Sequence, residues 1–87
     1  MTNNSITQEH IDSLIRESQV NIKTVFGKCT IVAVQLKNGF VLVESSSCVD
    51  PMNYSEAMGA SICMERIKNR LWELEGYKLQ NELGGGR

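Results

Sequence analysis

The chain has 87 residues with nine basic and ten acidic side chains, a balance that excludes general nucleic-acid binding. A chain this short buries only about 60–65% of its unfolded surface, so we expect it to gain stability by oligomerising. It has no stretch of transmembrane length and no signal-peptide pattern. Three cysteines without close-paired spacing indicate reduced thiols in a cytoplasmic protein. We expect one domain over residues 1–83 and a flexible glycine-rich tail over 84–87.

The first expected element is a short helix from about Thr7 to Gln19. Thr7 is a favourable N-cap residue, and Ile6 and Ile11 are spaced to pack against each other across it. The helix has one apolar stripe, which predicts that it lies on the surface of a larger unit. The residues of this stripe are Ile11, Leu14 and Ile15.

Three runs of strand-like sequence follow and predict an antiparallel meander. They cover Val20–Phe26, Cys29–Leu36 and Phe40–Ser46. We expect Gly27-Lys28 to turn the chain between the first two strands. Asn38-Gly39, between two apolar runs, predicts a two-residue turn between the last two.

That two-residue turn fixes the register of the second hairpin, pairing Lys37 with Phe40 and Val34 with Val43. The face expected to join the core then carries Val32, Val34, Leu36, Val41 and Val43. Phe40 falls on the other face, together with Ile31, Ala33, Leu42 and Glu44. Because this second face is half apolar, we expect a second layer, a partner chain or a ligand to cover it.

One long helix is expected from near Asn53, where Asn53 and Glu56 resemble a capping box, to about Gly76 or beyond. Whether it breaks at Gly76 is left open. The stripe expected to face the sheet is Ala57, Ala60, Met64, Ile67, Leu71 and Leu74. About 23 helical residues span roughly 34 Å, which exceeds a seven-residue strand of about 23 Å. The helix therefore overhangs its sheet, and we expect a dimer or hexamer.

Residues with catalytic chemistry are sparse. His10 is the only histidine and lies in the expected surface helix. The sequence has no metal-ligand cluster, P-loop or dinucleotide fingerprint, so we expect no enzyme activity, no metal and no cofactor. The serine-rich loop Ser45–Ser47, by contrast, brings hydroxyl and backbone N–H groups to a helix N-terminus, where anions are favoured. The same loop is also compatible with a simple connector, in which Asp50 caps local N–H groups.

Two further features, an arginine pair and a phenylalanine, each allow two interpretations. Arg66 and Arg70 are four residues apart and share a helix face, which suits a bidentate grip on phosphate. The same spacing also fits a solvated charged face with an Arg70–Glu73 pair. Phe40 is suited to stack on a nucleobase, or to pack against the first helix or a second subunit.

A combination of motifs resembles a family of short tailed-phage proteins. The motifs are Leu36–Ser46, Cys48–Pro51, Asn53-Tyr54 and Trp72–Tyr77, and the resemblance covers roughly Val32–Tyr77. The family in turn is similar to the first-described class of phage anti-Thoeris proteins. Those proteins are sponges that capture cyclic ADP-ribose isomers and, in some members, cyclic di- and trinucleotides.

The resemblance implies sequestration of an immune messenger without chemistry, between subunits. Phe40 fits the role of stacking on the base. The resemblance implies that Asp50 and Asn53 form hydrogen bonds with the base or ribose. It implies that Arg66 or Arg70 contacts the phosphate. Arg16 of a neighbouring subunit would close the pocket.

The sequence thus predicts an α+β fold, with a short N-terminal helix, a three-stranded antiparallel sheet and one long C-terminal helix. The expected partners are a small nucleotide-derived signalling molecule and further copies of the chain, with no DNA, RNA or membrane. The alternative is a phage protein that binds a host or phage protein through the mixed sheet face. Acidic residues on the exposed side of the sheet would favour that alternative, and a cleft with converging arginines would favour the sponge.

Overall fold

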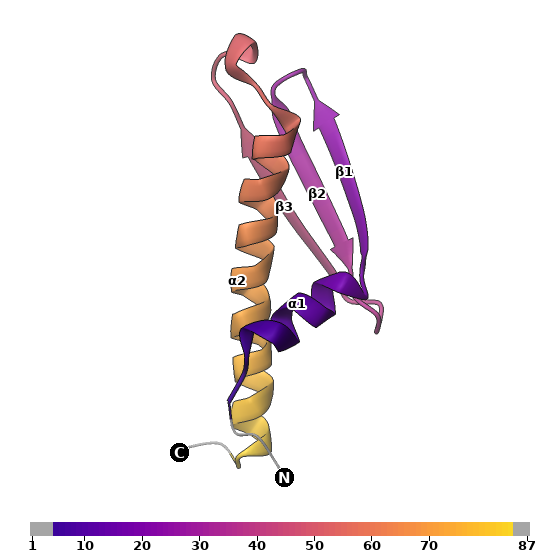
Figure 1. Cartoon of the computed structure of the whole chain (residues 1–87), viewed down its shortest axis with the longest axis vertical. Coiled ribbons are helices and arrows are strands. Elements are labelled where there is room, and N and C mark those ends of the chain that lie inside the picture. The colour runs from indigo at the N-terminus through magenta and orange to yellow at the C-terminus, as the bar shows by residue number, and fades with distance from the viewer. Residues whose placement is uncertain (1–4, 85–87) are drawn as a thin grey trace.

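The protein is described here by a computed structural model that covers residues 5–84. Its elements are α1 (Gln8–Arg16), β1 (Gln19–Val25), β2 (Cys29–Gln35), β3 (Val41–Ser47), the 3-10 turn η1 (Pro51–Asn53) and α2 (Glu56–Glu82). The antiparallel strands lie in the order β1-β2-β3, and α2 runs along one face of the sheet (Figure 1). This arrangement confirms the predicted α+β fold. The predicted tail lies outside the described residues except for Gly84.

α1 begins as the sequence predicts. The Thr7 hydroxyl accepts the N–H of His10 at 3.1 Å and so caps the helix. Ile11 is fully buried and anchors α1 in the core. The helix ends at Arg16, earlier than expected, because Gln19 already pairs in β1.

The hairpin between β1 and β2 turns slightly earlier than expected. Phe26 and Gly27 both have positive φ, +56° and +67°. The N–H of Lys28 closes this turn by donating to the carbonyl of Val25 at 3.3 Å. The turn therefore centres on Phe26-Gly27 rather than on Gly27-Lys28.

The hairpin between β2 and β3 corrects the predicted register. Leu36 donates its N–H to the Phe40 carbonyl at 2.8 Å, and Gly39 donates its own to the Leu36 carbonyl at 2.8 Å. The connection therefore has three residues, with Gly39 at φ +94°, as in a type I turn followed by a left-handed residue. Val34 consequently pairs with Leu42, one residue away from the predicted partner.

This shift exchanges the two faces of β3, because successive side chains on a strand point to opposite sides. Leu42 is fully buried, whereas Val41 and Val43 are 51% and 50% exposed. The prediction that Val41 and Val43 face the core was wrong. Phe40 lies opposite Leu36 and therefore on the side that faces α2, rather than on the outer face.

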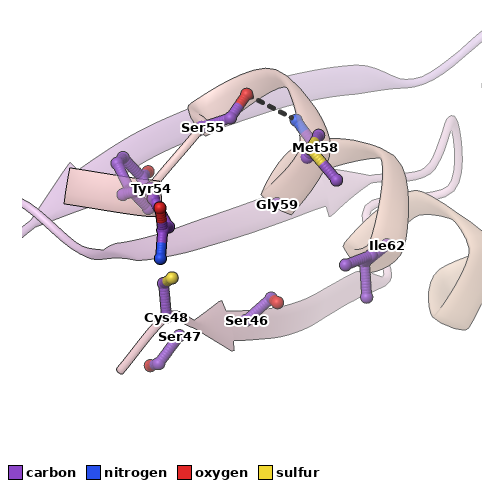
Figure 2. A pocket seen from close by; sticks show the side chains of 9 residues that line it. Ser46, Ser47, Cys48, Tyr54, Ser55, Met58, Gly59 and Ile62 are labelled. Carbon is purple, nitrogen blue, oxygen red and sulfur yellow. Dashed lines mark hydrogen bonds between the residues drawn. The ribbon is translucent and has the colours of Figure 1, made fainter. Parts of the chain in front are cut away.

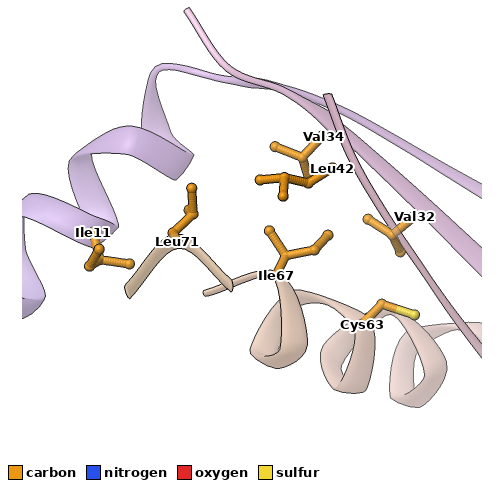
Figure 3. Close-up of a cluster of buried hydrophobic side chains, with 7 residues drawn as sticks. All are labelled: Ile11, Val32, Val34, Leu42, Cys63, Ile67 and Leu71. Carbon is orange, nitrogen blue, oxygen red and sulfur yellow. The ribbon is translucent and has the colours of Figure 1, made fainter. Parts of the chain in front are cut away.

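The core lies between α2 and the two strands that it covers, β2 and β3 (Figure 3). For α2 the predicted stripe holds at Ile67 and Leu71 but not at Ala57 and Leu74, which are exposed. The buried face of the helix is rotated towards Gly59 and Cys63, whose small side chains let the helix approach β2. The fully or almost fully buried apolar residues are Ile11, Val32, Val34, Leu42, Cys63, Ile67 and Leu71.

The start of α2 also differs from the expectation. Ser55, not Asn53, is the N-cap, and its hydroxyl accepts the N–H of Met58 at 3.3 Å. The Glu56 carboxylate accepts the hydroxyl of Thr24 on β1, so the predicted Asn53–Glu56 capping box is not formed. The helix continues without a break through Gly76, and its 27 residues span about 40 Å. It therefore overhangs the strands, as the sequence predicts.

Candidate functional site

A hollow of about 160 Å³ lies where the end of β3, the following loop and the start of α2 meet (Figure 2). We call it the junction pocket. This is the place where the sequence predicts a polar loop beside a helix N-terminus. Its lining residues are Ser46, Ser47, Cys48, Asn53, Tyr54, Ser55, Met58, Gly59 and Ile62.

Hydrogen bonds fix Tyr54 at the junction pocket. Its hydroxyl shares a hydrogen bond of 2.6 Å with Thr30 and another of 2.7 Å with Thr24. Thr30 is fully buried on β2, directly beneath Gly59 of α2. The tyrosine thereby ties the loop before α2 to both β1 and β2, which holds this end of the pocket in place.

The junction pocket combines polar and apolar surface without any charged side chain among its lining residues. Serine hydroxyls at the end of β3 form one side, and Met58 and Ile62 of α2 form the other (Figure 2). The N–H groups of Met58 and Gly59 are bonded to the hydroxyl and the carbonyl of Ser55. The positive end of the α2 dipole is therefore what favours an anion here. The hydroxyl and amide groups among its lining residues can exchange hydrogen bonds with a ligand.

The predicted ligand residues do not gather at this pocket within one chain. Asn53 lines it, and nearby Asp50 accepts the N–H of Met52 at 2.9 Å, the local capping role considered for it. Phe40 lies at the other end of β3, about 23 Å away along seven residues. There it borders a second hollow of about 170 Å³ together with Leu71 and Leu74.

The arginines have structural partners. Arg66 donates to the carbonyl of Ser45 at 2.7 Å, and Arg70 donates to that of Val43 at 3.3 Å. Arg70 also pairs with Glu44 at 3.4 Å, so its carboxylate partner comes from β3 and not from its own helix. The arginine side chains thus run from α2 to the outer edge of β3, a role that sequence spacing alone did not indicate.

Arg16 lies apart from the other arginines. It is exposed in the last turn of α1, and its side chain makes no hydrogen bond or ion pair with the described residues. It does not line the junction pocket. The predicted convergence of arginines in a cleft is therefore absent within residues 5–84 of a single chain.

Cys29, Cys48 and Cys63 are all free. Burial raises the pKa of the Cys63 thiol, which disfavours the reactive thiolate. Within the described part of the chain, no group of three or more histidine, cysteine or acidic residues is placed to hold a metal ion.

Comparison with known proteins identifies the family. The model of the phage protein family described as N4 Gp49/phage Sf6 gene 66 matches residues 6–83. The chain belongs to this phage protein family. The match extends from α1 to the end of α2 and includes every residue of the junction pocket. No curated protein and no solved structure matches this phage protein. Among the described residues, no helix is long and apolar enough to cross a membrane.

Proposed function

We propose that this phage protein acts against host defence by binding and sequestering a small nucleotide-derived messenger in the host cytoplasm, without catalysis. The observation that carries the proposal is the junction pocket, in which serine hydroxyls at the end of β3 face an apolar wall of Met58 and Ile62 beside the N-terminus of α2. A nucleotide offers matching chemistry, because its phosphate suits the helix N-terminus and its base suits the apolar side. The proposal also rests on the resemblance of this phage protein family to the anti-Thoeris sponges.

The size of the pocket indicates how such a ligand would be held. Sites that enclose a drug-sized ligand measure about 300–1,000 Å³, whereas the junction pocket holds about 160 Å³. One chain therefore covers only part of a cyclic nucleotide. Met58 and Ile62 at its rim are exposed apolar residues, which supports a second copy of the chain closing over the ligand.

Arg66 is the arginine best placed to join this site. It follows Ile62 by one helical turn, and its hydrogen bond to Ser45 lies one residue from Ser46 in the pocket wall. A guanidinium group has five N–H donors, and only one bond of the Arg66 side chain is to the described residues. The remaining donors are available to a phosphate without loss of the contact with β3.

A second candidate function is binding of another protein through the outer face of the sheet. The observation in its favour is the half-exposed pair Val41 and Val43 on that face. The acidic character that would favour this alternative is absent, because Lys23 is the one charged side chain that the strands place there.

Calorimetric titration with cyclic ADP-ribose isomers, cyclic dinucleotides and cyclic trinucleotides tests the proposal. We expect at least one to bind, with affinity reduced at least tenfold by Arg66→Ala and by Ile62→Ala. Leu74→Ala is the matched control, since Leu74 and Ile62 are 40% and 42% exposed on the same helix. It should leave affinity unchanged. Binding that survives the first two changes would place the ligand elsewhere, and no binding across the panel would refute the proposed function.

A further inference from the structure

The two edges of the sheet differ in how their backbone groups are used. The bond from Leu36 to Phe40 and the bond from Cys48 to Lys28 show that even-numbered residues of β3 turn their N–H and C=O groups towards β2. Odd-numbered residues of β3 therefore turn theirs outward. The outward carbonyls of Val43 and Ser45 are occupied by Arg70 and Arg66. This edge is thus capped by arginines, a common way to block the addition of another strand.

The β1 edge has no such cap. By the same alternation, the outward N–H and C=O groups of β1 belong to Val20, Ile22 and Thr24. No described residue hydrogen-bonds to these backbone groups, and Figure 1 shows the outer side of β1 uncovered. The side chains of Val20 and Ile22 are 43% and 45% exposed, because α2 packs mainly on β2 and β3. The edge therefore presents both unpaired backbone and apolar surface.

We propose that two copies of this chain join β1 to β1 in antiparallel fashion, with Ile22 on the two-fold axis, to form one six-stranded sheet. In this register Ile22 faces Ile22 of the second copy, and Val20 faces its Thr24. All three residues have outward backbone groups, so each of these pairs can exchange hydrogen bonds. The exposed apolar side chains meet on the α2 side of the joined sheet.

Charge and register favour a second copy as the partner. On the outer face the same pairing sets Lys23 opposite Asn21 of the second copy, so that the two lysines do not oppose each other. A pairing centred on Lys23 would instead set the two lysines opposite each other. A pairing centred on Asn21 would set Val20 opposite Ile22, and the cross-linking experiment below distinguishes it from the proposed register. The segment Val20–Thr24 is thus complementary to itself.

The β1 contact uses none of the residues that line the proposed ligand site. The two sites meet at the hydrogen bond between Thr24 of β1 and Tyr54 of the junction pocket. A protein that fails to bind any nucleotide can still dimerise through β1. If both contacts form, the assembly is larger than a dimer.

Light scattering coupled to size-exclusion chromatography tests the contact in the full chain. We expect a mass of at least twice 9.7 kDa, reduced by half in Ile22→Lys. Val43→Lys is the matched control, because Val43 is similarly exposed on the far strand, and it should keep the parental mass. A chain that is monomeric at 100 µM, or an Ile22→Lys variant of unchanged mass, would overturn the proposal and leave β1 open to a strand of another protein.

Cross-linking tests the register separately. Opposed residues in a hydrogen-bonded antiparallel pair have Cα atoms about 5.5 Å apart, within the range for a disulfide. Ile22→Cys should therefore form a disulfide-linked dimer on mild oxidation, whereas Val20→Cys should not, because the two copies of residue 20 are offset by four residues. The parent chain, with its three native thiols, gives the background. Preferential cross-linking of Val20→Cys would contradict the proposed register.

Discussion

Gly59 and Gly76 lie on the same helix but in opposite surroundings. A Cβ atom at position 59 would lie 2.2 Å from the hydroxyl oxygen and 2.7 Å from the Cβ of Thr30, whereas one at position 76 would meet nothing within 4 Å. Alanine is favoured over glycine within a helix by about 1 kcal/mol at either position. We therefore expect Gly76→Ala to stabilise the protein by about that amount.

Gly59→Ala should have the opposite effect. Inserting a methyl group into a packed site costs about 1–3 kcal/mol, and displacement of Thr30 would break its bond to Tyr54, which costs about 1 kcal/mol more. These losses exceed the gain in helix propensity, so the variant should be less stable by about 1–3 kcal/mol.

Urea unfolding at one protein concentration measures both variants, since association would otherwise add to the apparent stability. With a denaturant slope of about 1 kcal/mol/M, the two midpoints should differ by about 2 M or more. Equal midpoints, or a Gly59→Ala variant more stable than the parent chain, would refute the close approach of α2 to β2.

Three further predictions test the packing described above. Leu42→Ala should lower the free energy of unfolding by about 2–5 kcal/mol and Val43→Ala by less than about 0.5 kcal/mol. If urea unfolding shows the larger loss for Val43→Ala, the register predicted from the sequence is the correct one. Tyr54→Phe should cost about 1–3 kcal/mol in the same assay, because it leaves a buried threonine hydroxyl without its partner; an unchanged midpoint would contradict that bond. Replacing Arg66 and Arg70 together by alanine should speed aggregation on warming, measured by turbidity, since it uncaps β3; unchanged turbidity would speak against capping.

Local sequence patterns were sufficient to predict most of the fold. Thr7 was readable as an N-cap, and the strand and helix runs were readable from their apolar periodicity. The register of the second hairpin was not readable, because Asn38-Gly39 fits both a two-residue turn and the end of a three-residue connection. In the structure the side-chain Oδ1 of Asn38 accepts the N–H of Phe40 at 3.0 Å, within the three-residue connection. That single residue of difference moved Phe40 and Leu42 to the side facing α2.

Part of the candidate site was also predictable from local sequence. The serine loop and the start of α2 are neighbours in sequence, so their meeting at the junction pocket followed from local order. The partners of the arginines depend instead on where α2 lies across the sheet. Arg66 and Arg70 are about 6 Å apart along the helix, close to the spacing of roughly 7 Å between alternate residues of a strand. This match becomes meaningful only once α2 is known to run beside β3.

The central claim, sequestration without chemistry, is tested most directly by recovering the ligand. The protein would be incubated with each messenger of the panel, separated from free ligand by gel filtration, then denatured, and the released nucleotide identified by mass spectrometry. The account predicts that one messenger co-elutes with the protein and is released chemically unchanged. Release of a hydrolysed or linearised product would show an enzyme, and a protein fraction free of nucleotide would contradict sequestration itself.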